Sequence, residues 1–142
     1  MLLSWVKLIV AFLVVLGLNG CKENRSPRFL FNNLVGMTIP ETAVIHHYQT
    51  RSFRDSEHYF IVCFDNELEL VEAVGSFSID EAQSDSRRIE IMQLVEGIAA
   101  RTEAPNFELH RGDGNAYYGH SKMKNKYIRA VKLDNCLHFG AQ

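Results

Sequence analysis

The segment 58–64, HYFIVCF, decides how this chain folds. Successive side chains of a strand point to opposite faces, and here both sets are apolar. One set is Tyr59, Ile61 and Cys63, and the other is Phe60, Val62 and Phe64. A strand of this kind lies inside a sheet that is covered on both sides. Segment 42–50 is rich in β-branched and aromatic residues, and the short charged loop 51–57 predicts that the two strands form an antiparallel hairpin.

A helix is expected directly after the hairpin, over residues 66–75. Asn66 followed by Glu69 is a capping-box pattern, and Gly75 is a typical helix end. The apolar side is expected to contain Leu68, Val71 and Val74, and the outward side Glu67, Glu69 and Glu72. We interpret these carboxylates as a solvated helix face rather than a metal or acid–base site.

A second helix is expected over residues 85–101, after a loop that covers 76–84. Ser84 or Asp85 can cap its first turn, and Pro105 prevents its continuation. Apolar residues recur at helical spacing, which predicts one buried stripe. The stripe contains Ile91, Met92, Val95, Ile98 and Ala99, widened by Ile89 and Leu94.

The C-terminal part returns to strand patterns, expected at 107–110, 116–120, 126–133 and 136–139, with turns between them. Runs of strands and runs of helices, without strict alternation, are typical of α+β proteins. We therefore expect a mostly antiparallel sheet of about five strands with two helices packed on one face. The other face is expected to be partly wet or covered by the N-terminal segment.

The first twenty residues have the pattern of a secretory signal peptide. Lys7 precedes an apolar run over 8–16, and small residues follow Gly17. The alternative is an uncleaved membrane helix, but Lys7 would interrupt the ~20 apolar residues that such a helix needs.

The end of this segment, Leu18-Asn19-Gly20-Cys21, resembles the lipobox of bacterial lipoproteins. Leu18 matches the aliphatic position, Gly20 the small residue before the cut, and Cys21 the modified residue, whereas Asn19 differs from the usual small residue. The resemblance implies cleavage before Cys21 and attachment of fatty acyl chains, such as palmitate, at Cys21. Since Lys22 replaces the aspartate that retains such proteins in the inner membrane, it implies an outer-membrane anchor facing the periplasm.

The resulting organisation has three parts: a signal peptide over 1–20, expected to be helical, a lipidated tether over 21–35 and a single α+β domain over 36–142. Removing 1–20 from the 142 residues leaves 122, which is enough for one domain with a core of its own. Phe29, Leu30 and Phe31 are unusual in a tether. We expect them to dock on the domain, and the alternative is that they lie at the membrane surface.

Two cysteines remain if Cys21 carries lipid. The periplasm oxidises thiols, so we expect a Cys63–Cys136 disulfide that ties the last strand to an early one. The alternative is a pair of buried free thiols that act as small hydrophobic residues.

Composition and motifs argue against several function classes. The formal charge of −2 becomes −3 once Lys7 is removed with residues 1–20, and no block of Lys and Arg predicts a nucleic-acid partner. Six histidines are present, but none has the spacing of a metal site, and adjacent His46 and His47 point to opposite faces of a strand. No catalytic motif and no cofactor fingerprint is found. We therefore expect neither catalytic residues nor a cofactor.

Aromatic residues of the C-terminal strands form the candidate binding surface: Tyr117, Tyr118, His120 and Tyr127. Tyr combines apolar area with a hydroxyl and suits contact surfaces, although these rings could instead pack one face of the sheet. The sequence thus predicts a lipid-anchored periplasmic binding or accessory protein without catalytic activity, for example an immunity or inhibitor protein. The alternatives are an envelope-assembly scaffold and, less favoured, a small periplasmic enzyme.

Overall fold

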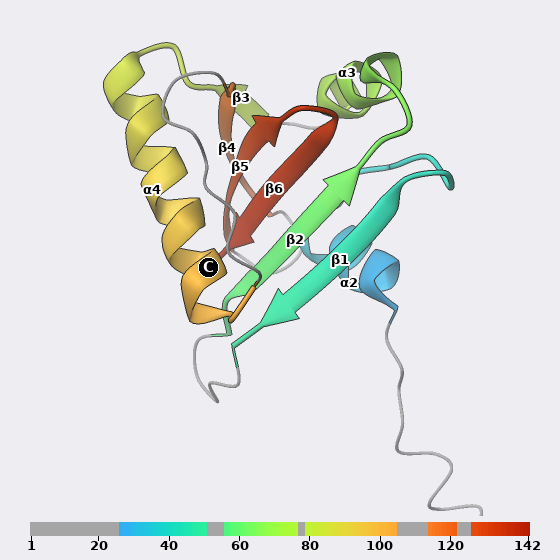
Figure 1. The fold of residues 1–142 in the computed structure, drawn as a ribbon, viewed down its shortest axis with the longest axis horizontal. Helices are drawn as coiled ribbons and strands as arrows, with labels where there is room; N and C mark the ends of the chain where they lie inside the picture. The colour runs from blue at the N-terminus through green and yellow to red at the C-terminus, as the bar shows by residue number, and fades with distance from the viewer. Residues whose placement is uncertain (1–25, 51–55, 77–78, 105–113, 122–125) are drawn as a thin grey trace, which may run out of the picture.

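The fold is an α+β architecture built on one antiparallel sheet of six strands (Figure 1). The structure is a computed structural model that describes residues 26–50, 56–76, 79–104, 114–121 and 126–142. The strands are β1 (Val44–Gln49), β2 (His58–Cys63), β3 (Ile79–Glu81), β4 (Ala116–His120), β5 (Tyr127–Leu133) and β6 (Cys136–Ala141). The helices of the described part are α2 (Pro27–Leu34), α3 (Glu67–Ser76) and α4 (Asp85–Arg101).

The hairpin predicted around segment 58–64 is confirmed. β1 and β2 are antiparallel neighbours, with Tyr48 opposite Tyr59, and the sheet order is β1-β2-β6-β5-β4-β3. The last strand, β6, inserts between β2 and β5 and pairs antiparallel with both. The strand that is apolar on both sides therefore has a neighbour on each edge, as its pattern predicted.

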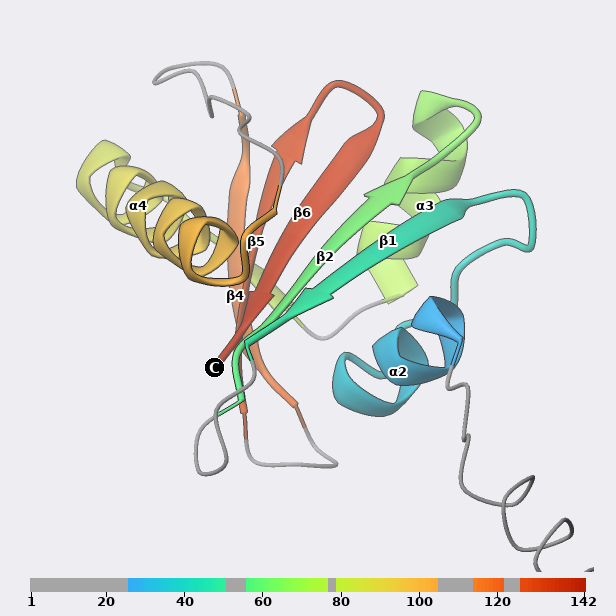
Figure 2. The ribbon, with the colours of Figure 1, turned by 60° about the horizontal axis from the view of Figure 1, so that its bottom comes forward.

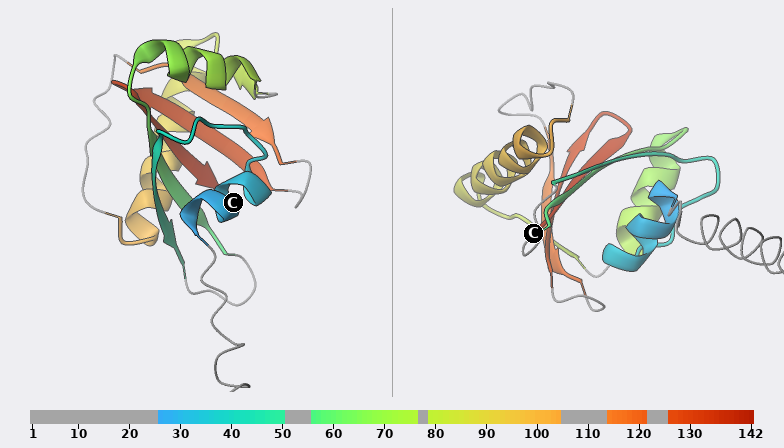
Figure 3. Two further views of the ribbon diagram at one scale, coloured as in Figure 1. Left: turned by 90° about the vertical axis from the view of Figure 1, so that its right-hand side faces the viewer. Right: turned by 90° about the horizontal axis from the view of Figure 1, so that it is seen from below.

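Helices cover both faces of the sheet, and the two predicted helices, α3 and α4, lie on opposite faces, so the expectation that they pack on the same face is wrong. Helix α2, from the N-terminal segment, helps to cover the second face, as one of the two alternatives expected. Helix α4 lies on one face, while α2 and α3 lie on the other (Figures 2 and 3). The reason is present in β2 itself. Phe60 and Val62 belong to the core beneath α2 and α3, whereas Tyr59 belongs to the core beneath α4, and each apolar face needs its own cover.

Helix α2 is part of the domain core, although it falls within the segment expected to be a tether. Ser26 caps its N-terminus, because Ser26 Oγ accepts a hydrogen bond from the Phe29 backbone N–H at 3.2 Å. Phe31 is fully buried and meets Phe60 and Phe139 edge-on, with ring centroids 5.3 and 5.0 Å apart. The expected docking is thus confirmed for Phe31, while Phe29 is 51 % exposed.

Arg28 fastens α2 to the chain that leads into β1. Its Nη1 donates to the carbonyls of Ile39 and Pro40, and its Nη2 to those of Glu41 and Ala43, at 2.9–3.4 Å. One guanidinium therefore satisfies four backbone acceptors in a segment without regular structure.

Helix α4 has the predicted bounds and the predicted central stripe, but Ile89, which was expected to widen the stripe, is 41 % exposed. Ser84 is its N-cap, and Ile91, Met92, Val95, Ile98 and Ala99 are buried. A side chain at Gly140 of β6 would place a Cβ 2.7 Å from Ile98 Cδ1. Glycine at this position lets the helix approach the sheet closely.

Helix α3 begins as predicted but presents a different side to the core. Asn66 Oδ1 accepts a hydrogen bond from the Glu69 backbone N–H at 2.9 Å. The buried residues are Leu70 and Ala73, and Val74 packs against the core as predicted, whereas Leu68 is 67 % and Val71 55 % exposed. Apolar residues surround much of this short helix, so its periodicity alone does not select the buried side.

The disulfide is confirmed. Cys63 and Cys136 occupy opposite positions on neighbouring strands β2 and β6, with Cα atoms 4.1 Å apart, and their sulfurs are bonded. The strand β3 was assigned to a loop, because it has only three residues and two of them, Asp80 and Glu81, are acidic. The strand expected over 107–110 lies outside the described residues.

Candidate functional site

The four predicted surface residues do not share one face of the sheet. Tyr117 packs in the core beneath α2 and α3 and is 7 % exposed, so for this ring the packing alternative is correct. Tyr118, one residue later in β4, points to the α4 side. The alternation of a strand separates the two tyrosines.

The other three residues lie together on the α4 side of β4 and β5. His120 is directly opposite Tyr127 in the β4–β5 register, and their ring centroids are 4.4 Å apart. Tyr127 is 58 % exposed, although it belongs to a strand with neighbours on both edges. Two residues along β4, Tyr118 is opposite Arg129.

Two arginines complete this group. The Arg87 guanidinium lies over the Tyr118 ring, 5.0 Å from its centroid, and that of Arg129 lies 5.8 Å from the Tyr127 centroid. We call the five residues Arg87, Tyr118, His120, Tyr127 and Arg129 the cation–aromatic surface. Arg129 could have been found from the sequence, because it follows Tyr127 by two positions on a strand. Arg87 comes from the first turn of α4, and its contact depends on how the helix crosses the sheet.

The arginines on this side differ in their partners. Arg87 Nη1 is 2.8 Å from Glu90 Oε2, and farther along α4 the Arg101 Nε is 2.6 Å from Glu57 Oε2. The Glu57 hydrogen bond raises the pKa of Arg101. By contrast, Arg129 Nη1 is buried and has no hydrogen-bond acceptor among the residues that the structure describes. A shielded donor without an acceptor is costly in a folded protein, and it marks Arg129 as unusual.

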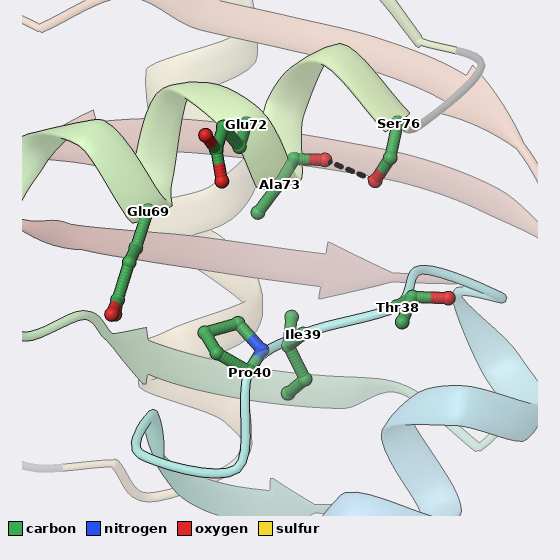
Figure 4. A pocket seen from close by; sticks show the side chains of 7 residues that line it. All are labelled: Thr38, Ile39, Pro40, Glu69, Glu72, Ala73 and Ser76. Atoms are coloured by element: carbon green, nitrogen blue, oxygen red, sulfur yellow. Dashed lines mark hydrogen bonds between the residues drawn. The ribbon is translucent and has the colours of Figure 1, made fainter.

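A cavity lies on the opposite side of the molecule, between α3 and the segment that leads into β1 (Figure 4). It has a volume of about 300 Å³ and is lined by Thr38, Ile39, Pro40, Glu69, Glu72, Ala73 and Ser76. Ser76 Oγ donates to the Ala73 carbonyl at 2.7 Å, and Glu69 accepts from Thr42 at 3.4 Å. The Ser76 hydroxyl is therefore already engaged with its own helix.

A line of hydrogen bonds that the sequence did not reveal lies at the loop end of the β1–β2 hairpin. His58 Nδ1 is 3.0 Å from His47 Nε2, and His58 Nε2 is 3.2 Å from Ser56 Oγ. His47 also stacks on Phe60, and burial lowers the pKa of His47. The sequence suggested comparing His47 with its neighbour His46, whereas the hydrogen-bond partner of His47 is His58 on the next strand.

The histidines do not converge on a metal-binding arrangement in the described part of the chain. His46 is exposed on β1, His138 is buried beneath α4, and His120 belongs to the cation–aromatic surface. No group of three or more His, Cys, Asp or Glu side chains among the described residues could hold a metal ion. His110 and the expected lipidation site, Cys21, lie outside these residues.

None of the helices in the described ranges is long and apolar enough to cross a membrane. No family model, no curated protein and no solved structure matches this chain.

Proposed function

We propose that this chain is a lipid-anchored binding or accessory protein of the bacterial envelope, without catalytic activity, that contacts a protein partner through the cation–aromatic surface. In this proposal Cys21 carries the acyl chains, which attach the mature chain to the outer membrane. The domain that begins near Ser26 then faces the periplasm. Each buried methylene of an acyl chain contributes about 0.8 kcal/mol, so two or three chains give stable attachment.

The observation that carries the binding role is the exposure of Tyr127. This ring is 58 % accessible, yet it lies on an interior strand between His120 and Arg129. Tyr and Arg are enriched at the centres of protein–protein interfaces, where large rigid side chains bury much area at low entropic cost. A ring that only filled the core would lie beneath α4, as Tyr59 does.

The Cys63–Cys136 disulfide supports the proposed location. Disulfides persist in oxidising compartments such as the periplasm and are rare where thiols are kept reduced. The bond links two strands that already pair, so an oxidising environment would keep the sheet covalently closed.

An immunity or inhibitor protein is the concrete form that we favour, because one exposed surface fits one partner. A second candidate is an envelope-assembly scaffold, which must hold two partners. Leu68 and Val71 favour it, since both are exposed on α3, and α3 lies on the sheet face opposite to α4. These two side chains provide an apolar contact area separate from the cation–aromatic surface.

Photo-crosslinking in intact cells tests the proposal. A photo-reactive phenylalanine derivative replaces Tyr127 in the full-length chain, and irradiation should trap one defined protein in an adduct. The matched control places the same group at Val44, which is 54 % exposed on the outer strand β1. Adducts at position 127 and not at position 44 support the binding role. Their absence at 127, or equal yields at both positions, contradicts it. A second defined adduct from position 68 would favour the scaffold.

A further inference from the structure

We propose that the cation–aromatic surface binds an acidic side chain of its protein partner, and that Arg129 holds the partner's carboxylate. This inference rests on the proposed binding function and specifies its chemistry. The observation behind it is that Arg129 Nη1 is buried and has no hydrogen-bond acceptor among the described residues.

Arg129 has no hydrogen bond or ion pair with any described residue, and its Nη1 is shielded from solvent. A guanidinium has five N–H donors and no acceptor, and its fork matches the two oxygens of a carboxylate. A buried donor without an acceptor costs more free energy than an ordinary hydrogen bond contributes in net terms. A carboxylate that arrives with a partner would remove this cost only in the complex.

The neighbouring cations do not offer the same opportunity. Arg87 is paired with Glu90, and Arg101 is paired with Glu57. A new carboxylate at either of them would compete with an existing ion pair. Arg129 has no such competitor among the described residues, so the local electrostatics direct an incoming negative charge to it.

The surroundings of Arg129 fit one carboxylate better than a polyanion. A nucleic acid or another polyphosphate needs several unpaired Lys or Arg side chains along its backbone. Within the described ranges, one guanidinium without an ion-pair partner, that of Arg129, lies beside Tyr127, and Tyr118 is opposite Arg129 in the strand register. Aromatic rings exclude water around a charged contact, which strengthens its hydrogen bonds.

The experiment repeats the crosslinking from position 127 in variants of the full-length chain. Arg129→Gln should reduce the adduct at least tenfold. Arg129→Lys, which retains the charge but not the fork, should reduce it less. Arg101→Gln is the matched control: its guanidinium is already paired with Glu57 and lies outside the cation–aromatic surface, so the adduct should fall by less than threefold. The thermal unfolding midpoint of each variant is measured to show that it folds.

Mass spectrometry of the adduct then identifies the partner segment, which should contain an Asp or Glu. Replacing that residue by Asn or Gln should reduce the adduct as much as Arg129→Gln does. An adduct that persists in the folded Arg129→Gln variant, or a segment without an acidic residue, overturns this inference while the binding function stands. If position 127 of the otherwise unchanged chain traps nothing, both proposals are wrong.

Discussion

The phenol of Tyr59 and the imidazole of His138 are hydrogen-bonded in the core beneath α4. Tyr59 Oη is 2.8 Å from His138 Nδ1, and 79 residues separate the two in the sequence. Burial raises the pKa of Tyr59 and lowers that of His138 to about 4, so both groups are neutral near pH 7. Two polar side chains thus lie in an apolar core because each satisfies the other.

His138 makes the domain sensitive to acid. As the pH falls below 6.5, His138 is protonated in the unfolded chain, whereas in the folded chain it stays neutral until about pH 4. Proton uptake therefore favours unfolding. Stability should therefore be complete above pH 6.5 and should decrease toward pH 4. The contribution of His138 is about 2.5 kcal/mol between pH 7 and 4.5.

Urea unfolding at pH 7 and pH 4.5 measures this effect. In His138→Gln, the stability lost between the two pH values should be smaller than in the unchanged chain by about that amount. His46→Gln is the control, because His46 is exposed on β1. Equal acid losses in His138→Gln and in the unchanged chain would contradict the assignment.

Phe31 tests whether α2 belongs to the folded domain. Phe31→Ala removes a fully buried ring that touches Phe60 and Phe139, and should cost about 3–5 kcal/mol of unfolding free energy. Phe29→Ala, two residues earlier and half exposed, should cost less than about 0.5 kcal/mol. Denaturant melts of both variants provide the comparison. Similar small losses would mean that α2 is a detachable tether.

The disulfide should stabilise the domain chiefly by restricting the unfolded chain. The bond joins residues 73 positions apart, and loop-closure entropy predicts a contribution of about 4 kcal/mol. Cys63→Ser combined with Cys136→Ser should lower the urea midpoint accordingly, and a reductant should have no further effect on this variant. A midpoint that does not respond to reduction of the unchanged chain would argue that the bond contributes little.

Arg129 and Arg28 should respond oppositely to removal of their charge. Arg129→Met should leave stability unchanged or increase it, because no hydrogen bond to a described residue is lost. Arg28→Met removes the Arg28 donor from four backbone carbonyls, of which, in the described part of the chain, only that of Pro40 keeps a second donor, the Ala43 N–H, and should cost about 1–3 kcal/mol. Thermal unfolding of the two variants checks the contrast. A large loss in Arg129→Met would show that Arg129 serves the fold rather than a partner.

Much of the fold could be predicted from local patterns. HYFIVCF, the Ser84 cap and the stripe of α4 each agree with the structure, because burial on both faces or on one helical side leaves a clear period. The buried side of α3 and the strand β3 were harder to predict. Helix α3 is apolar around much of its surface, and β3 is short and acidic. The placement of helices on both faces follows from β2, but only if its two apolar faces are weighed together.

The candidate site was predictable only in part. Strand alternation could have separated Tyr117 from Tyr118 and joined Arg129 to Tyr127, whereas the Arg87 contact depends on the path of α4 across the sheet. The same holds for the line from His47 through His58 to Ser56, which requires a cross-strand register. Contacts between different helices and strands can be identified only once the fold is known, because no residue spacing in the sequence predicts them.

The anchor is the claim on which the proposed location and partner both depend. Intact mass spectrometry of the protein purified from bacterial membranes tests it most directly. We predict a chain that begins at Cys21 and carries the added mass of a diacylglyceryl group, with or without a further acyl chain on the amino group. A chain that retains Met1, or one that begins elsewhere with an unmodified Cys21, would contradict it.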